Sequence, residues 1–229
     1  INGKDLEAIL TTTNEFIPQE TVVQWAVELC DVLSYLHNHE PEPIIFRDMK
    51  PSNVMISHHG HVVLVDFGIA KPFQAGQRGT MIGTEGYSPP EQYRGEANHL
   101  ADIYALGATL HHMLSRRDPR LEAPFSFSER PIRETNPAVR PELEEAINKA
   151  LHYEPVDRYQ SAQAMKDALV TVIRKTGMLS SDMARSTAAF TASLKGVQAL
   201  WDFACEDEIR GTPTLHDGLL SVSYTHLTL

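Results

Sequence analysis

A seven-residue segment, residues 47–53, brings acidic, basic and amide side chains close together in the sequence. It reads Arg-Asp-Met-Lys-Pro-Ser-Asn and lies between two apolar runs that are typical of strands. Asp48 is two residues from Lys50 and five from Asn53. A carboxylate, an amine and an amide at this spacing suit the transfer of a phosphoryl group to a hydroxyl, in which a protein mainly positions groups and stabilises charge. The alternative is a solvated loop that turns at Pro51.

Each of these three side chains has its own part in such a reaction. The Asp48 carboxylate can orient the acceptor hydroxyl and finally take its proton. The Lys50 amine can neutralise charge on the moving phosphoryl group. The amide oxygen of Asn53 can hold a metal ion. The segment therefore predicts groups for both the acceptor and the metal.

A second acidic group follows an apolar strand pattern, in the triplet Asp66-Phe67-Gly68. A carboxylate fixed at a strand end is a good ligand for a hard metal ion, and Gly68 lets the backbone turn sharply. By itself the triplet also fits an ordinary strand end and turn. Its position thirteen residues after Asn53, beyond a predicted hairpin, favours a metal ligand.

The helices that must position these groups follow from apolar periodicity. Residues 18–37 predict a helix with one buried stripe, and Pro18 suits its first turn. Residues 100–114 are apolar nearly all round, which places that helix in the centre of a domain. Two further amphipathic helices are predicted near residues 138–151 and 161–174. The stripes consist of Val22, Ala26, Leu29, Leu33 and Leu36 in the first helix, Leu143, Ala146, Ile147, Ala150 and Leu151 in the third, and Met165, Ala168, Leu169, Val172 and Ile173 in the fourth.

Two short strands are predicted around a turn at Gly60, in residues 53–57 and 61–68. Val62 to Val65 are apolar at consecutive positions, which predicts a strand covered on both faces. Residues 71–98 contain Gly, Pro, Thr and Gln without periodicity. A connection of this length is usually functional or disordered.

Composition bounds the class of protein. The 229 residues are enough for one to two domains, and a hydrophobic content of 42% allows a sizeable core. The formal charge of 20 minus 30, or −10, argues against nucleic acid or an anionic membrane as the main partner. We expect no transmembrane span, because no apolar run reaches the length that a membrane helix needs. Cys30 and Cys205 are expected to be unpaired thiols, which suits a cytoplasmic location.

These motifs, in this order, resemble the C-terminal lobe of a eukaryotic-like Ser/Thr protein kinase of the kind found in bacteria. The resemblance covers residues 1 to about 175 and implies an α+β fold, a mainly helical lobe with a small β-hairpin. It implies that Asp48 is the catalytic base and that Lys50 contacts the γ-phosphate of ATP and favours Ser/Thr acceptors. It implies Mg²⁺ ligation by Asn53 and Asp66, and contacts of Asp5 and Met55 with the nucleotide. Protein substrates and ATP are the expected partners.

The resemblance also assigns supporting residues around the segment "GTEGYSPPEQY", which resembles the end of a kinase activation segment. The segment "FRDMKPSN", residues 46–53, resembles the catalytic loop of the family. Thr84 is expected to brace this loop, and Asp102, in "DIYALG", to hold its backbone. Arg158 is expected to pair with Glu91. Phe46 is expected to pack on Phe67 of the Asp66-Phe67-Gly68 triplet, and Arg47 to receive a phosphate on Thr80 of the activation segment.

The chain departs from the kinase pattern in four places. Phe46 stands where His or Tyr is usual, Pro89 stands where Ala is usual, and "DIYALG" carries apolar Tyr and Leu substitutions. The printed residues include no Gly-rich loop, no strand lysine of the V-A-I-K type and no helix glutamate to pair with it. "INGKDLEAIL" has no initiator Met and no signal-peptide pattern, so we expect the middle of a longer chain whose N-lobe lies upstream. We therefore expect these residues alone to be inactive and the full-length parent to be active.

The alternative to an enzyme is a pseudokinase scaffold in which the C-terminal part does the binding. Composition changes near residue 176, and residues 176–196 predict a flexible linker. Residues 197–221 resemble the start of a PQQ-like β-propeller repeat, which implies a sensor or scaffold that binds a ligand or protein, without implying the quinone cofactor. Residues 222–229 break that pattern and resemble translated adapter sequence. The presence of Asp48, Lys50, Asn53 and Asp66 argues for the enzyme.

Overall fold

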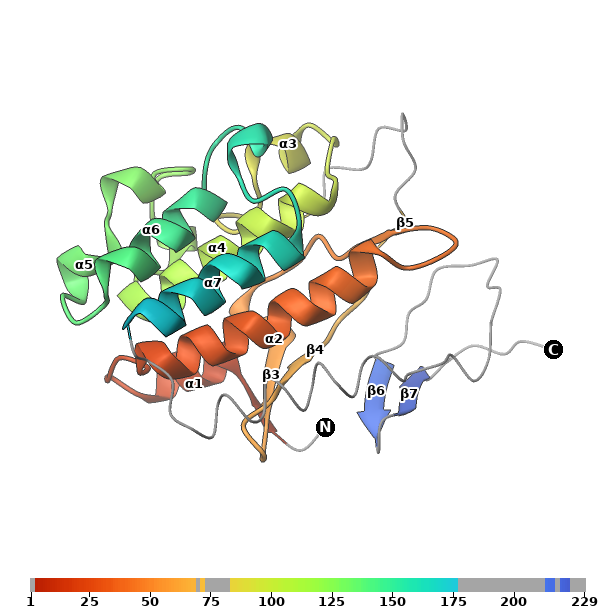
Figure 1. Cartoon of the computed structure of the whole chain (residues 1–229), viewed down its shortest axis with the longest axis horizontal. Coiled ribbons are helices and arrows are strands. Elements are labelled where there is room, and N and C mark those ends of the chain that lie inside the picture. Colours follow the sequence, from red (N-terminus) through yellow and green to blue (C-terminus); the bar gives the residue numbers. More distant parts are fainter. Residues whose placement is uncertain (1–2, 69–70, 73–82, 177–212, 217–218, 223–229) are drawn as a thin grey trace.

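The computed structural model describes residues 3–68, 71–72, 83–176, 213–216 and 219–222, and its main body is a helical lobe with a small sheet at one side (Figure 1). The helices are α1 (Leu6–Thr12), α2 (Gln19–His37), α3 (Pro90–Tyr93), α4 (His99–Ser115), α5 (Ile132–Thr135), α6 (Pro141–Ala150) and α7 (Ala162–Thr176). Short 3₁₀ turns lie at Pro51–Asn53, Pro119–Leu121, Phe127–Glu129 and Pro155–Asp157. The strands are β1 (Gly3–Asp5), β2 (Ile44–Ile45), β3 (Val54–Ser57), β4 (Val62–Leu64), β5 (Lys71–Pro72), β6 (Pro213–His216) and β7 (Leu219–Val222).

Helix α4 is the centre of the lobe, as its apolar sequence predicts. Every residue from Leu100 to Ser115 is buried, and α2, α5 and α6 all pack against it. The helix begins where the Asn98 side chain accepts a hydrogen bond from the Leu100 N–H at 2.8 Å. It ends at Arg116, which adopts a left-handed conformation with φ +59°. Asp102 is thereby carried on the buried part of this central helix.

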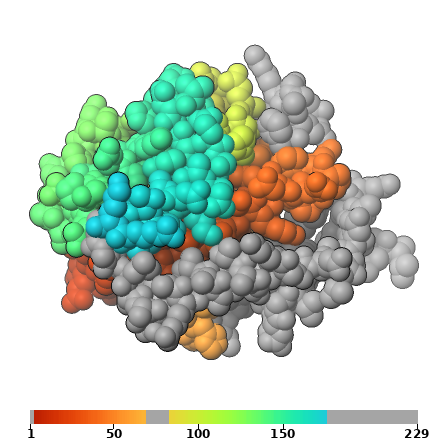
Figure 2. Space-filling view, viewed as in Figure 1, coloured from red at the N-terminus to blue at the C-terminus, as the bar shows by residue number. Residues whose placement is uncertain are grey.

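Helices α2, α6 and α7 form the outer layer, and α6 and α7 face the viewer in Figure 2. The predicted stripes of all three helices turn inward, with Ala168 only partly buried. Helix α2 starts one residue after Pro18, whose carbonyl accepts from the Val22 N–H at 3.1 Å. Helix α6 starts at Pro141 rather than near residue 138, because a proline is favoured in the first turn of a helix and the residues before it form a turn.

The predicted hairpin is confirmed, and a third strand joins it. Strands β1, β3 and β4 form an antiparallel sheet in that order, with Asp5 opposite Met55 and Met55 opposite Val63. Gly60 has φ +82° at the turn between β3 and β4. The prediction that Val62 to Val65 are covered on both faces is wrong, because only Leu64 in this run is buried. Strand β4 is the outer strand of the order, and the element packed against it is α2.

A two-residue ladder positions the segment that leads to Asp48. Strand β2 pairs with β5, with Ile44 opposite Pro72 and Ile45 opposite Lys71. This pairing brings the chain just before Asp48 close to the chain that follows the Asp66-Phe67-Gly68 triplet. Neither β1 nor the β2–β5 pair is predicted by local periodicity, since each strand has only two or three residues.

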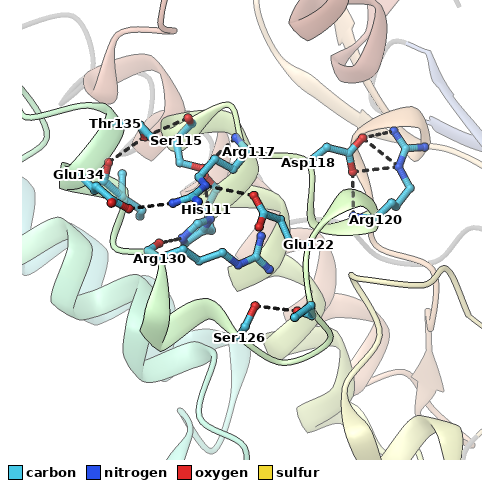
Figure 3. A network of polar contacts seen from close by, with 12 residues as sticks. His111, Ser115, Arg117, Asp118, Arg120, Glu122, Ser126, Arg130, Glu134 and Thr135 are labelled. Carbon is cyan, nitrogen blue, oxygen red and sulfur yellow. Dashed lines mark hydrogen bonds and ion pairs between the residues drawn. The ribbon is translucent and has the colours of Figure 1, made fainter.

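A polar network secures the connection between α4 and α5 (Figure 3). His111 Nε2 donates to the main-chain carbonyl of Arg130 at 2.9 Å, and its Nδ1 lies 3.2 Å from the Ser115 hydroxyl. Arg117 pairs with Glu122 at 3.1 Å. Burial of the His111 ring lowers its pKa to about 4. The ring is therefore neutral at neutral pH.

In the C-terminal part the structure describes only β6 and β7, which pair antiparallel with Thr214 opposite Ser221. The rest of the predicted repeat and nearly all of the predicted linker lie outside the described residues, and Thr176 is the last residue of α7 rather than the first of a linker. Among the helices that the structure describes, none combines the length and the apolar character needed to cross a membrane.

Candidate active site

Asp48 is the centre of the candidate active site. It lies between β2 and the 3₁₀ turn Pro51–Asn53, and its side chain is 11% exposed. Its Oδ1 accepts a hydrogen bond from the Thr84 hydroxyl at 2.6 Å, and its Oδ2 accepts one from the Asn53 amide at 2.8 Å. The Lys50 amine lies 2.8 Å from the same Oδ2. The structure thus brings together the three functional groups predicted in residues 47–53.

Thr84 and Lys50 also hold each other. Lys50 Nζ donates to Thr84 Oγ1 at 2.8 Å, while that hydroxyl donates to Asp48. The expected bracing contact of Thr84 with the catalytic loop is present. An ionised carboxylate has about four lone-pair positions, and the contacts with Thr84, Asn53 and Lys50 use three of those on Asp48. Among the contacts of the described residues, one position on Oδ1 is left for a further hydroxyl.

The backbone before Asp48 has an unusual conformation that Asp102 stabilises. Arg47 has φ +69°, in the left-handed region, which costs an ordinary residue about 1 to 2 kcal/mol. The Asp102 carboxylate, fully buried in α4, accepts hydrogen bonds from the N–H groups of Phe46 at 2.9 Å and Arg47 at 2.7 Å. Hydrogen bonds to a charged acceptor contribute about 1.5 to 3 kcal/mol each, which is enough to offset the strain. The expected contact of Asp102 with this backbone is confirmed.

His37 completes the surroundings of Asp102 and was not predicted. Its Nε2 lies 2.8 Å from Asp102 Oδ2, and its side chain is 8% exposed. It is the last residue of α2, one position after the buried Leu36. The sequence shows only that a histidine ends an amphipathic helix pattern. This does not predict that Asp102 is its partner.

The triplet Asp66-Phe67-Gly68 lies beside the catalytic loop. The Phe67 and Phe46 rings pack edge to face with centroids 5.2 Å apart, as expected. Asp66 is exposed and has φ +62°, so the left-handed residue is Asp66 and not Gly68, where the sequence predicted the sharp turn. Aspartate tolerates this conformation because its short side chain bonds locally. Here Oδ1 accepts from the Gly68 N–H at 3.3 Å.

The oxygen atoms of Asn53 and Asp66 fit Mg²⁺. The Val65 N–H donates to the Asn53 carbonyl at 2.9 Å, so Asp66 directly follows the residue bonded to Asn53. The Asn53 amide nitrogen is committed to Asp48, which leaves the side-chain oxygen Oδ1 as the atom for a cation. Mg²⁺ prefers oxygen ligands and is commonly held by one or two protein side chains together with substrate phosphates. One carboxylate and one amide oxygen satisfy that preference.

The predicted nucleotide contacts, Asp5 and Met55, lie opposite each other in the β1–β3 ladder. Asp5 also caps α1, because its Oδ1 accepts from the Ala8 N–H at 2.7 Å. Both side chains are partly exposed. They are therefore neighbours on the sheet whose strand β3 directly follows the 3₁₀ turn at Pro51–Asn53.

A buried ion pair anchors the segment that carries Thr84. Arg158 and Glu91 form a bidentate pair with N–O distances of 2.5 and 3.0 Å, as expected. The side chains are 0% and 4% exposed. The guanidinium also donates to the main-chain carbonyls of Leu100, His152 and Tyr153. The start of α3 is thereby tied to α4 and to the chain between α6 and α7.

Of the predicted pair of Arg47 and phosphorylated Thr80, the structure describes only Arg47. Arg47 is half-buried, and burial lowers the pKa of its guanidinium while Asp102 opposes that change. Its Nε is buried with no hydrogen-bond partner among the described residues. Thr80, the predicted phosphorylation site, lies outside the described residues.

Comparison with known proteins identifies the family. The model of the protein kinase domain matches residues 1–170. The Ser/Thr-protein kinase PknB of Mycolicibacterium smegmatis is 33% identical over 186 residues, which cover 75% of this chain and 29% of the relative. The tyrosine-protein kinase MasK of Myxococcus xanthus is 33% identical over 191 residues, covering 75% of this chain and 30% of that protein.

The match covers only part of the chain and part of each relative. The chain spans less than a third of the length of the curated relatives it matches. The family model ends at residue 170, before the predicted linker and propeller, and the propeller stays a prediction. Together with the contacts around Asp48 and Asp102, the match over residues 1–170 shows that the chain belongs to the protein kinase family and is related to bacterial Ser/Thr kinases.

Proposed function

We propose that this chain carries the acceptor-side and metal-side groups of a Ser/Thr protein kinase that transfers the γ-phosphoryl group of ATP to protein hydroxyls. The observation that carries the proposal is the set of contacts on Asp48. Thr84, Asn53 and Lys50 hold its carboxylate, and the contacts within the described part of the chain leave one lone-pair position unused. A solvated loop would not need three buried or half-buried side chains to fix one carboxylate.

In the proposed reaction Asp48 acts on the acceptor. Its Oδ1 accepts a hydrogen bond from the incoming Ser or Thr hydroxyl and so points the oxygen toward the γ-phosphorus. As the oxygen–phosphorus bond forms and the bond to the leaving ADP oxygen breaks, the hydroxyl proton passes to Asp48. Lys50 stabilises the charge on the transferred group from its position beside Oδ2.

Asn53 and Asp66 are the proposed Mg²⁺ ligands, and Asp5 and Met55 are the proposed nucleotide contacts. A magnesium ion held by these residues would neutralise charge on the phosphate oxygens. The printed 229 residues include no Gly-rich loop and no V-A-I-K lysine, so we expect them alone to show negligible transfer. Such elements would have to be supplied by additional sequence.

The preference for Ser and Thr is the finer part of the proposal. Two supports are the position of Lys50, two residues after Asp48, and the relatives named as Ser/Thr kinases. The relative named as a tyrosine kinase makes this preference testable. Acceptor peptides that differ only in Ser, Thr or Tyr at one position should be phosphorylated on Ser and Thr and spared on Tyr.

We further propose that Arg47 receives a phosphate on Thr80. The buried Nε without a partner among the described residues supports a role as a phosphate donor group. Phosphopeptide mapping of the autophosphorylated protein tests this. Phosphate on Thr80 is expected, and an unmodified Thr80 in an active preparation would refute the proposed pairing of Arg47 with phosphorylated Thr80.

The function itself is tested by phosphotransfer from radiolabelled Mg-ATP to a basic protein acceptor. The complete gene product that contains residues 1–229 is expected to transfer phosphate, and residues 1–229 alone are not. Nucleotide binding without any transfer by the gene product would favour the scaffold alternative instead.

A further inference from the structure

Gln92 makes a long-range contact that neither the sequence motifs nor the family resemblance assigns to it. It is the third residue of α3 and is 2% exposed. Its Nε2 donates to the main-chain carbonyl of Arg47 at 2.8 Å, across 45 positions of sequence. Arg47 directly precedes the proposed catalytic base.

The contact fixes the peptide unit that leads into Asp48. The carbonyl that Gln92 holds belongs to the peptide bond between Arg47 and Asp48. The N–H of Arg47 is held from another side by Asp102, at 2.7 Å. A φ of +69° is unfavourable for a residue other than glycine. The two hydrogen bonds therefore hold the Arg47 backbone in this conformation and fix the position of the backbone at Asp48.

Gln92 is itself held firmly. Its neighbour Glu91 forms the buried pair with Arg158, and its Nε2 lies 3.3 Å from Ser88 Oγ. Gly83 packs against the same amide, since a Cβ at that position would lie 2.3 Å from Nε2 and 2.1 Å from Ser88 Oγ. The amide therefore has little freedom to turn away from the Arg47 carbonyl.

We infer that Gln92 is a positioning residue that sets the placement of Asp48 through the Arg47 carbonyl. Residues 83–93 then contact the catalytic loop at two points. Thr84 donates a hydrogen bond to the Asp48 carboxylate, and Gln92 donates one to the Arg47 carbonyl. This inference rests on the proposed function, because it gives Gln92 a part in phosphotransfer. Its structural half, control of the Arg47–Asp48 backbone, can be measured without activity.

Two variants remove the donor in different ways. Gln92→Glu keeps the shape but places a carboxylate oxygen against the carbonyl, and Gln92→Met keeps the approximate volume without a donor. The matched control is Asn136→Asp, because Asn136 is also buried and its Nδ2 donates to the main-chain carbonyl of Leu114 at 2.9 Å, outside the candidate active site. All three variants delete a buried amide-to-carbonyl hydrogen bond, and the Gln92 variants also lose the contact of Nε2 with Ser88 Oγ.

The first readout is steady-state phosphotransfer by the complete gene product that contains these residues. Both Gln92 variants are expected to lower kcat about tenfold, because small displacements of a reacting group have large effects on rate. The KM for ATP is expected to stay within about twofold, since the hydrogen bonds described for Gln92 are with Arg47 and Ser88, neither of which is a proposed nucleotide contact. A loss confined to kcat marks an interaction that matters in the transition state. Asn136→Asp is expected to keep the wild-type kcat.

The second readout is hydrogen exchange of the Phe46 and Arg47 amides, which bond to Asp102. Both Gln92 variants should speed exchange in a peptide covering residues 44–49 about tenfold or more, and the control should leave it unchanged. Faster exchange without any phosphotransfer by the wild type would refute the proposed function and keep the backbone role. Exchange and kcat that match the control in both Gln92 variants would overturn the inference.

Discussion

The contribution of the buried Arg158–Glu91 pair to the stability of the lobe can be measured. This pair anchors the segment that carries Thr84. Glu91→Gln preserves the shape of the side chain and removes its charge. Arg158→Met removes the guanidinium and keeps most of the apolar stem. The two variants and their combination form a double-mutant cycle across a pair whose partners are 0% and 4% exposed.

The structure gives an order of magnitude for each arm. Removing one partner of a buried ion pair costs about 3 to 5 kcal/mol, because the remaining charge is left uncompensated. Arg158→Met should cost at least about 1 kcal/mol more than Glu91→Gln, because it also leaves the carbonyls of Leu100, His152 and Tyr153 without their donor. The double variant should lose less than the sum by at least about 1 kcal/mol, since the two groups contact directly.

Urea unfolding followed by circular dichroism measures the free energy of unfolding of each variant. Glu96→Gln is the control, because its partner Arg94 lies 3.7 Å away and both side chains are more than half exposed. That change should stay within about 0.5 kcal/mol. Costs below about 1 kcal/mol for Glu91→Gln, or strictly additive effects of the two changes, would refute the reasoning.

Three further outcomes follow from the same geometry. Asp102→Asn replaces one of two acceptor oxygens, so the Phe46 and Arg47 amides should exchange faster in hydrogen-exchange mass spectrometry, and equal protection would contradict the assigned role. The pKa of His111 is lowered to about 4, so the unfolded chain binds a proton first and stability should fall as pH drops from 6.5 toward 4. The Tm of His111→Gln should depend less steeply on pH in that window, and parallel profiles would be inconsistent with a neutral buried ring. Asp66→Asn should raise the Mg²⁺ concentration needed for nucleotide binding by the complete gene product about tenfold or more, measured by titration calorimetry, whereas an unchanged Mg²⁺ requirement would remove Asp66 as a ligand.

The helices were largely predictable because their burial follows local periodicity. Helix α4 is buried from Leu100 to Ser115, as expected of a segment that is apolar nearly all round. The predicted stripes of α2, α6 and α7 face the core for the same reason. The coverage of Val62 to Val65 was overestimated, because an apolar run indicates what a strand could bury and not which elements lie against it.

The remaining site geometry depends on contacts between distant parts of the chain. The bond from Gln92 to Arg47 spans 45 positions and that between His37 and Asp102 spans 65, so no local pattern contains either. The left-handed conformations of Arg47 and Asp66 could not be predicted from residue type either, since neither residue is a glycine. The short strands β1, β2 and β5 are defined by their pairing partners and carry too few residues for a periodic signal.

The central claim is that Asp48 acts on the acceptor hydroxyl in phosphotransfer. The most direct measurement compares wild type with Asp48→Asn in the complete gene product, using Mg-ATP, a protein acceptor and a parallel nucleotide-binding assay. Asp48→Asn should lower kcat about 100-fold or more. Nucleotide affinity should stay close to the wild-type value, because the described contacts of Asp48 include neither Asp5 nor Met55, the proposed nucleotide contacts, and the change leaves the Lys50 and Asn53 side chains themselves unaltered. A variant that binds nucleotide and still transfers phosphate at the wild-type rate would contradict the account.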